Sequence, residues 1–295
     1  MIIFDALGIR LLRTLQLKNL NNLYMNRNSQ ILTCSTFPHT QTSNIMIWSG
    51  QYRDYYWIFN TTKKWTDSAR HERKPQWDGI KIIRYNDLNI NNWIWKIIES
   101  NGYKSRAVSI PVVLPPVYYN SPYKTDKYFP YPEKDLYDNL RFKEDATMKS
   151  LEDMKNNEID FYCTSFDQPD RLLHAIAEGY IDEEFLVKEM HYLDNVAKKI
   201  DEYCNKNDIT YCIFGDHGLP NPEGEHFFYH LEQYIVSVRH RKHSIIISNH
   251  EGKLPEYTDE IYQWMLDYYK IKINKTIKEM FFKHDYNFHS TKAIQ

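Results

Sequence analysis

Short apolar runs separated by amphipathic segments are the feature that most restricts what this chain can fold into. The run YCIF, at 211–214, puts four large apolar side chains in a row, which is typical of a parallel strand covered on both faces. Polar or turn-forming residues bound each of the other runs, at 2–4, 107–113, 159–164 and 244–247. We therefore predict five strands, of which the one that contains YCIF covers 210–214.

Amphipathic stretches between these runs predict helices. Residues 93–100 have apolar side chains at helical spacing and stop near Asn101-Gly102, a common helix end. Residues 185–205 place an apolar stripe opposite a charged face, and 261–269 repeat this pattern over a shorter length. Strands that alternate with helices indicate βαβ units, so we predict an α/β fold of three α/β/α layers around a mostly parallel sheet.

Two stretches do not fit that alternation. Residues 52–92 are rich in aromatic and charged side chains, and residues 114–145 are rich in Pro and Tyr. Neither has a clear period, and both are too long for ordinary loops. We predict one domain over 1–295, with these stretches as lid or cap insertions over a site.

Charge and composition exclude several classes of partner. The chain has 37 Lys and Arg against 39 Asp and Glu, so a net charge of -2 provides no general attraction to duplex nucleic acid or an anionic membrane. No stretch approaches about 18 uninterrupted apolar residues, and the start MIIFDALGIRLL has no basic region or cleavage site, so we expect a soluble cytoplasmic protein. The four cysteines lack CxxC spacing, which favours buried free thiols.

Carboxylates and imidazoles follow several of the predicted strands. Asp5 ends the first run, and Asp216 and His217 end the run at 211–214. Asp170 and His174 follow the run at 159–164, four residues apart, so both would face one side of a helix. Such residues at the carboxyl ends of parallel strands form a ligand set suited to Zn²⁺ or Mn²⁺, although each residue alone also fits a turn or a helix surface.

Histidines concentrate near the end of this set. Six of the twelve lie within 34 residues: His217, His226, His230, His240, His243 and His250. Another stretch, FPHTQTSNIMIWSG at 37–50, has a hydroxyl-rich turn before a predicted helix. A Thr at that helix start is usually a cap, but the helix dipole and a nearby metal ion can also make it a nucleophile.

Together these motifs resemble the type I phosphodiesterase/nucleotide pyrophosphatase branch of the alkaline phosphatase superfamily. That family has, in order, an Asp after the first strand, a Thr ten residues before a Gly, an Asp-x-x-x-His, an Asp-His-Gly and a later His. This chain has Asp5, Thr40 with Gly50, Asp170 with His174, then the triplet 216–218 and the histidine-rich segment. The resemblance covers most of the chain as separated motifs, and it implies an alkaline phosphatase-like fold.

The resemblance also implies a site with two divalent cations, zinc or alternatively manganese. One would be held by Asp5, Thr40, Asp216 and His217, and the other by Asp170, His174 and a late histidine. We take His240 as that histidine, with His243 and then His226 as alternatives. Thr36, in STFP, competes with Thr40 as the nucleophile, and Asp167 is a weaker alternative ligand.

The implied activity is metal-dependent hydrolysis of a small phosphodiester or pyrophosphate substrate, such as a nucleotide, through a phosphothreonine intermediate. Phosphomonoester and phosphonate hydrolysis use related sites, and a non-catalytic binding protein on the same scaffold is a further alternative. The residues after Cys34 lack the Pro and Arg spacing of sulfatases. Aromatic residues of the insertions could stack on a nucleobase or pack the insertions onto the domain; they are Trp57, Trp65, Trp77 and Tyr118.

Several positions depart from the family pattern. Asp5 is followed by Ala6 where Gly is common, Thr40 lacks the Pro often found two residues later, and the residue after the gap that follows His240 is Ser in place of Gly. These departures concern the phosphate side of the site and remove no ligand. The chain is also shorter than many members of the family, so the resemblance does not imply a full substrate-binding cap.

Overall fold

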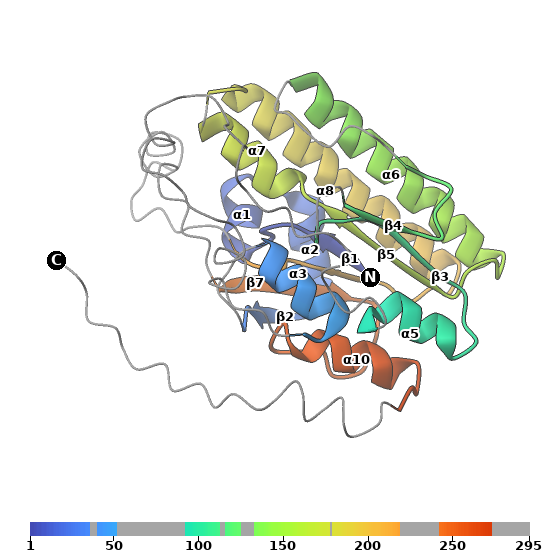
Figure 1. Ribbon diagram of the computed structural model, residues 1–295. Coiled ribbons are helices and arrows are strands. Elements are labelled where there is room, and N and C mark those ends of the chain that lie inside the picture. The colour runs from blue at the N-terminus through green and yellow to red at the C-terminus, as the bar shows by residue number, and fades with distance from the viewer. Residues whose placement is uncertain are drawn as a thin grey trace, which may run out of the picture.

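The N-terminal apolar run, Ile2–Phe4, forms strand β1 in the middle of the sheet. We describe the protein from a computed structural model, over residues 1–35, 40–51, 92–112, 116–124, 133–177, 179–218 and 242–272. In these residues the sheet has seven strands in the order β2-β7-β6-β1-β5-β3-β4 (Figure 1). The other strands are β2 (Asn28–Thr33), β3 (Ser105–Ile110), β4 (Val117–Tyr119), β5 (Phe161–Phe166), β6 (Cys212–Phe214) and β7 (His243–Ser248).

Most of these strands run in one direction, as predicted. Strand β1 pairs in parallel with β5 and β6, and β3 pairs in parallel with β5. Strand β7 is antiparallel to both β6 and β2, while β4 is antiparallel to β3. The strand predicted at 244–247 is therefore correct as a strand, but it runs against the parallel centre of the sheet.

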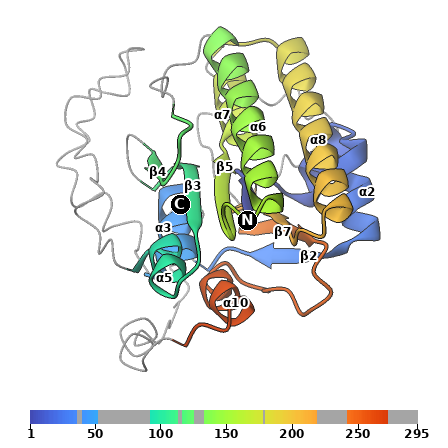
Figure 2. The ribbon, with the colours of Figure 1, turned by 90° about the vertical axis from the view of Figure 1, so that its right-hand side faces the viewer.

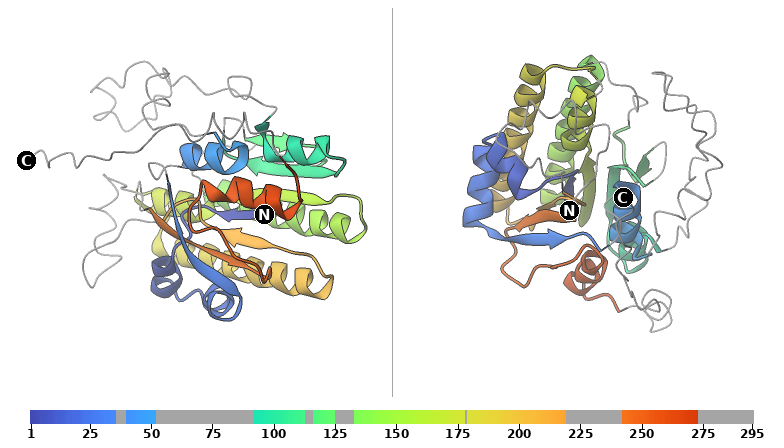
Figure 3. Two further views of the ribbon diagram at one scale, coloured as in Figure 1. Left: turned by 90° about the horizontal axis from the view of Figure 1, so that it is seen from below. Right: turned by 90° about the vertical axis from the view of Figure 1, so that its left-hand side faces the viewer.

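Helices cover both faces of the sheet, which confirms the predicted three-layer architecture (Figures 2 and 3). Along β1, Ile2 and Phe4 belong to one hydrophobic core and Ile3 belongs to the other. The first core is covered by α1 (Ile9–Thr14), α2 (Lys18–Asn26), α6 (Glu133–Lys155), α7 (Gln168–Ala177) and α8 (Glu183–Lys206). The second is covered by α3 (Thr40–Ser49), α5 (Ile94–Ser100) and α10 (Glu260–Tyr268).

The helices predicted from apolar spacing are confirmed. The stretch 185–205 forms most of α8, in which Leu186, Met190 and Leu193 are buried. Asp182 caps this helix by accepting a hydrogen bond from the Phe185 backbone N–H at 2.8 Å. The stretches 93–100 and 261–269 correspond to α5 and α10.

The prediction that all of 114–145 is an insertion is wrong for two parts of that range. Val117–Tyr119 is strand β4, and residues 133–145 belong to helix α6. Leu136 and Leu140 on α6 are buried in the first core, but the many charged residues on either side of this pair hide the helical period. Residues 52–91, 114–115 and 125–132 of the predicted insertions lie outside the described residues.

Two further predictions concern thiols and membrane spans. Cys34, Cys163, Cys204 and Cys212 are buried, as predicted, and none of the four forms a disulfide within the described residues. Burial raises the pKa of the Cys204 and Cys212 thiols to about 12, so both are uncharged at neutral pH. Among the described helices, none combines the length and apolar character needed to cross a membrane.

Helix α2 obtains its N-terminal cap from another helix. Leu17, at its N-cap position, has no side-chain oxygen to accept a bond. The carboxylate of Asp194, on α8, accepts instead from the backbone N–H of Asn19 at 3.0 Å and of Leu20 at 2.7 Å. Because Asp194 is only 3% exposed, these bonds join α2 to α8 in a region that water does not reach.

We expect Asp194→Ala to lower the free energy of unfolding by about 2 kcal/mol, since it leaves two N–H groups of α2, that of Asn19 partly buried and that of Leu20 buried, without their acceptor. Urea unfolding measures the change. Glu202→Ala is the matched control, because Glu202 is an exposed acidic residue on the same helix and should change stability by less than about 0.5 kcal/mol. Equal effects of the two substitutions would contradict this role of Asp194.

Candidate active site

Three neighbouring parallel strands end in polar side chains at one edge of the sheet. Asp5 follows β1, Asp216 and His217 follow β6, and Asp170 lies in the first turn of α7, just after β5. Strand β1 lies between β6 and β5. Because the carboxyl ends of parallel strands meet at the same edge, the fold brings these residues together from distant parts of the chain.

Gly215 allows the ends of β6 and β1 to approach closely. A Cβ atom at this position would lie 2.4 Å from the backbone oxygen of Leu7 and 2.9 Å from the Cβ atom of Ser244. Both distances are too short for any side chain. The glycine therefore lets Asp216 lie beside the turn that carries Asp5.

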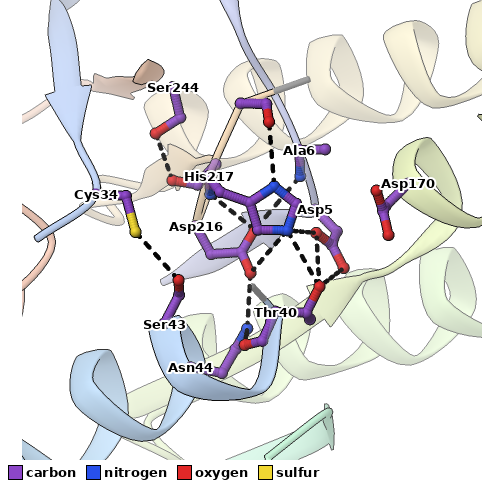
Figure 4. Close-up of polar contacts among 12 residues, drawn as sticks. Asp5, Ala6, Cys34, Thr40, Ser43, Asn44, Asp170, Asp216, His217 and Ser244 are labelled. Atoms are coloured by element: carbon purple, nitrogen blue, oxygen red, sulfur yellow. Dashed lines mark hydrogen bonds and ion pairs between the residues drawn. The ribbon is translucent and has the colours of Figure 1, made fainter. Parts of the chain in front are cut away.

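Asp5, Asp216 and His217 form a compact buried cluster (Figure 4). They are 2%, 0% and 0% exposed. The Nε2 atom of His217 lies 3.1 Å from Oδ1 of Asp5 and 3.9 Å from Oδ2 of Asp216. One ligand-type atom from each of the three residues lies within 4.8 Å of the others, so a single cation could be bound by all three.

The Thr40 hydroxyl lies next to this cluster. Thr40 is the first residue of α3, and its Oγ1 atom is 3.1 Å from His217 Nε2. It donates toward the Asp5 carboxylate, at 3.2 Å from Oδ2 and 3.4 Å from Oδ1. The structure thus places Thr40 among the residues predicted to share its metal ion.

The orientation of the His217 ring is set by the backbone. Its Nδ1 atom is 3.3 Å from the carbonyl oxygen of Gly218. A carbonyl only accepts hydrogen bonds, so Nδ1 carries a proton and donates. Nε2 therefore points toward Asp5 and Thr40, as in histidines that bind metals through one nitrogen and are oriented through the other.

Asp216 is held mainly by N–H donors. Its Oδ1 atom accepts from the backbone N–H of His217 at 3.1 Å and of Ala6 at 3.4 Å. Its Oδ2 atom accepts from the side-chain amide of Asn44 at 3.0 Å. Ala6 has a φ of 60°, in the left-handed region that glycine adopts more easily, so the turn after Asp5 keeps a conformation for which Gly is the common choice.

Burial and like charge shift the protonation of the cluster. Burial raises the pKa of Asp5 well above its ordinary value, and the charges of Asp216 and Asp170 raise it further. Burial also raises the pKa of Asp216. For His217, burial lowers the pKa, but the carboxylates of Asp216 and Asp5 raise it by more, so the net pKa is well above the ordinary value.

These shifts fit a cation site. Two carboxylates in a water-poor environment repel each other, and one imidazolium neutralises only part of their charge. A divalent cation would remove that repulsion and would take the lone pair of the His217 nitrogen in place of a proton. The donor set of two carboxylates, one imidazole and one hydroxyl suits zinc or manganese.

Asp170 and His174 form a second pair beside the cluster. They lie one turn apart on α7, with His174 Nε2 at 3.3 Å from Asp170 Oδ2. Asp170 is 8% exposed, while the His174 side chain is 26% exposed. Figure 4 shows Asp170 on the Asp5 side of the cluster, where its charge contributes to the raised pKa of Asp5.

Of the three histidines predicted as candidate ligands for the second metal ion, only His243 lies among the described residues. His240 and His226, and the rival nucleophile Thr36, lie outside the described residues. His243 begins β7, is exposed, and has its ring nitrogen 3.5 Å from the Thr33 hydroxyl on the edge strand β2. Among the described residues, His243 is also not part of the Asp5, Asp216 and His217 cluster that could hold a metal ion.

The carboxylate of Asp167 forms ion pairs with two side chains, Lys143 and Arg171. Its Oδ1 atom accepts from the ammonium group of Lys143, and its Oδ2 atom lies 2.5 Å from Nε of Arg171. Burial alone would raise the pKa of Asp167, but Arg171 and Lys143 lower it overall. This pairing favours Asp170 over Asp167 as the carboxylate that acts with His174.

Sequence reasoning missed two side chains near the site. Asn44 binds Asp216, and Lys143, which is buried on α6, binds Asp167. The signal for Asn44 was its position one helical turn after Thr40. Lys143 carried no such signal, because it lies in the part of α6, residues 133–145, that we predicted to belong to an insertion.

The aromatic residues of the predicted insertions are only partly described. Tyr118 packs against a small core that contains Val108 and Ala146, which agrees with the packing alternative. Trp57, Trp65 and Trp77 lie outside the described residues.

Comparisons with known proteins concern the fold. No protein-family model and no curated protein sequence matches the chain. Human ectonucleotide pyrophosphatase/phosphodiesterase 5 is similar with a TM-score of 0.55 and 12% identity, over 92% of this chain and 95% of that chain. The murine protein, in an inactive form in complex with AMP, has a TM-score of 0.52 and 11% identity, over 92% and 94%.

A third similar structure is Ps i-CgsB in complex with k-i-k-neocarrahexaose. Its TM-score is 0.52 at 12% identity, over 93% of this chain and 72% of that chain. At these identities the similarity shows a shared fold, and it confirms the predicted alkaline phosphatase-like fold class.

We expect Gly215→Ala to lower the free energy of unfolding by about 3 kcal/mol or more, because the added methyl group meets backbone at 2.4 Å. Thermal and urea unfolding measure the loss. Gly8→Ala is the control, since its Cβ would meet the His243 carbonyl oxygen at 3.4 Å and the Gly218 Cα atom at 3.9 Å, both ordinary contact distances, and it should cost less than about 1 kcal/mol. A Gly215→Ala protein as stable as the control would contradict the close approach of β6 to β1.

We also expect the wild-type protein without metal to become less stable as the pH rises from about 5 to about 8, and to lose more stability over this range than the Asp5→Asn variant. The pKa values of Asp5, Asp216 and His217 are raised in the folded state, so folding binds protons. The stability from these protons is present at low pH and is lost as the pH rises through the folded-state pKa values. Asp5→Asn removes one carboxylate and should flatten this dependence.

The measurement is the melting temperature in the presence of a chelator, as a difference between the two proteins. The amino group of Met1 has a lowered pKa because it is buried, so it acts in the opposite direction, but it is common to both proteins and cancels. A difference that stays constant over this pH range would contradict the shifts. Saturating Zn²⁺ should then stabilise the wild type more than Asp5→Asn.

Proposed function

We propose that this chain is a metal-dependent hydrolase of phosphodiester or pyrophosphate bonds in nucleotide-like substrates, with Thr40 as the nucleophile. One observation carries the proposal. The Thr40 hydroxyl lies 3.1 Å from His217 Nε2 and 3.2 Å from Asp5 Oδ2, beside three buried ligand-type side chains. A hydroxyl that served only to cap α3 would not need to lie beside a buried imidazole and buried carboxylates.

The residues that would hold the cations divide into two sets. Asp5, Asp216, His217 and Thr40 would hold one divalent cation, while Asp170, His174 and, outside the described residues, His240 would hold the other. When bound, such cations lower the pKa of a hydroxyl or water ligand and stabilise negative charge on phosphoryl oxygens.

Thr40 is placed to act as a nucleophile. It begins a ten-residue helix, whose N-terminal dipole favours negative charge on Oγ1 and on a nearby phosphate. In the proposed reaction, Oγ1 forms a bond to phosphorus as the bond from phosphorus to the leaving oxygen breaks, and the proton lost by Oγ1 passes through solvent to the leaving group. Water then attacks the phosphothreonine: its hydroxide bonds to phosphorus to give the phosphate product, and its proton passes to Oγ1 as the bond from Oγ1 to phosphorus breaks.

The substrate class rests on two supports. The motif order resembles the phosphodiesterase/nucleotide pyrophosphatase branch, and one structure with the same fold is in complex with AMP. Phosphomonoester and phosphonate hydrolysis would need the same nucleophile and are alternatives on this site. A substrate panel separates these activities.

We expect Thr40→Ala to reduce hydrolysis of bis-p-nitrophenyl phosphate by at least about 10³-fold, since no other group replaces the nucleophile. Thr40→Ser, which keeps a hydroxyl, should retain measurable activity. The measurement is the kcat of each variant, with metal content determined on the same samples, and wild type should contain about two metal ions per chain.

Thr36→Ala is the matched control, because Thr36 is the rival nucleophile in the same segment. Full activity in Thr40→Ala together with loss in Thr36→Ala would move the nucleophile to Thr36. Faster hydrolysis of p-nitrophenyl phosphate than of the diester would favour a phosphomonoesterase. A chain with neither metal nor activity would favour the non-catalytic binding protein.

A further inference from the structure

We infer that Asn44 is a positioning residue that fixes the Asp216 carboxylate as a metal ligand and ties it to the helix turn that carries Thr40. The inference rests on the proposed function and deepens it. Asn44 is fully buried on α3, one turn after Thr40. Its side-chain amide makes three hydrogen bonds, to Trp48, Asp216 and Thr40 (Figure 4 shows Asn44 with Asp216 and Thr40).

Trp48 determines which way the Asn44 amide faces. Its indole Nε1–H donates to Asn44 Oδ1 at 2.9 Å. An indole N–H can only donate, so the amide oxygen must lie on the Trp48 side and the NH₂ group on the opposite side. Trp48 is itself fully buried and packs against Trp95 and Phe214, with ring centroids 6.3 Å and 6.2 Å away.

The NH₂ group of Asn44 then has two acceptors. Nδ2 donates to Asp216 Oδ2 at 3.0 Å and to the Thr40 carbonyl oxygen at 2.8 Å. A bond from an Asn side chain to the carbonyl four residues earlier is common in helices and needs no function. The bond to Asp216 is different, because it joins α3 to a residue 172 positions away, after β6.

These bonds restrict how Asp216 can meet a cation. Its Oδ1 atom already accepts from the backbone N–H of Ala6 and of His217. Its Oδ2 atom accepts one bond from Asn44 and faces His217 Nε2 at 3.9 Å. Oδ2 is therefore the oxygen presented to the cluster, and Asn44 sets its direction.

The same amide couples the ligand to the nucleophile. Because Asn44 binds both Asp216 and the Thr40 backbone, a shift of either residue would strain one of the two bonds. The relay from Trp48 through Asn44 to Asp216 thus holds Thr40 and Asp216 in a fixed relation, and rigid positioning of this kind supports catalysis.

Three variants test this role. Asn44→Ala removes the amide, and Trp48→Phe removes only the indole donor while it keeps an aromatic ring against Trp95 and Phe214. Ser43→Ala is the matched control: Ser43 is buried on the same helix, but its hydroxyl lies 3.3 Å from Cys34 Sγ, and Figure 4 shows this contact with Cys34.

The readouts are the dissociation constant of Co²⁺, from its visible absorption spectrum, and kcat and KM for bis-p-nitrophenyl phosphate. Asn44→Ala should weaken Co²⁺ binding or lower kcat about 10- to 100-fold, with a smaller change in KM. Trp48→Phe should act in the same direction by about 3- to 10-fold, and should shift the Co²⁺ spectrum. Ser43→Ala should stay within about two-fold of wild type.

If Asn44→Ala and Trp48→Phe bind Co²⁺ and turn over substrate like Ser43→Ala, the inference is overturned, even if their melting temperatures fall. Should Asn44→Ala fail to fold, Trp48→Phe alone decides between these results. Wild type that neither binds Co²⁺ nor hydrolyses the diester would overturn the proposed function, and the inference with it. If only the inference fails, the wild-type protein still binds Co²⁺ and still hydrolyses the diester.

Discussion

Burial of two carboxylates side by side is the constraint on which the arrangement of this site depends. Asp5 and Asp216 are almost fully buried where neighbouring parallel strands end, so their charges repel in a setting that water screens poorly. The chain offsets the repulsion with the His217 imidazole and with N–H donors from the backbone and from Asn44. That offset is partial, as the raised pKa values of Asp5 and Asp216 indicate, and a bound cation would complete it.

The surrounding fold holds this arrangement rigid from both faces of the sheet. Helix α3, on one face, contributes Thr40 and Asn44, and its Trp48 is locked in the core with Trp95 and Phe214. Helix α7 packs with the core of the other face and contributes Asp170 and His174. A site made from both layers and three strand ends moves only if the core moves, which suits chemistry that depends on fixed distances.

The part of the fold that could be predicted follows from local pattern. The apolar runs that became β1, β3, β5, β6 and β7 were predicted because central strands are buried on both faces. Strand β2, at the sheet edge, mixes exposed polar residues with buried Leu32, so it had no such pattern. Helix α6 was missed because charged residues flank its core residues Leu136 and Leu140 on both sides. Its Arg141 and Glu144 bind side chains of α8, which a local pattern does not reveal.

The sequence by itself determined the type and order of the chemical groups. Asp5, Thr40, Asp170, Asp216 and His217 could be selected because each follows an apolar run or opens a helix, and because their order resembles one family of hydrolases. Only the tertiary structure decided which groups meet: the parallel order β6-β1-β5 joins residues more than 200 positions apart, and the close approach at Gly215 makes that contact possible. It also decided that Asp167 pairs with Lys143 and that Asn44 faces Asp216. Hydrogen bonds and ion pairs depend on distance and direction in space, and spacing along the chain does not specify either.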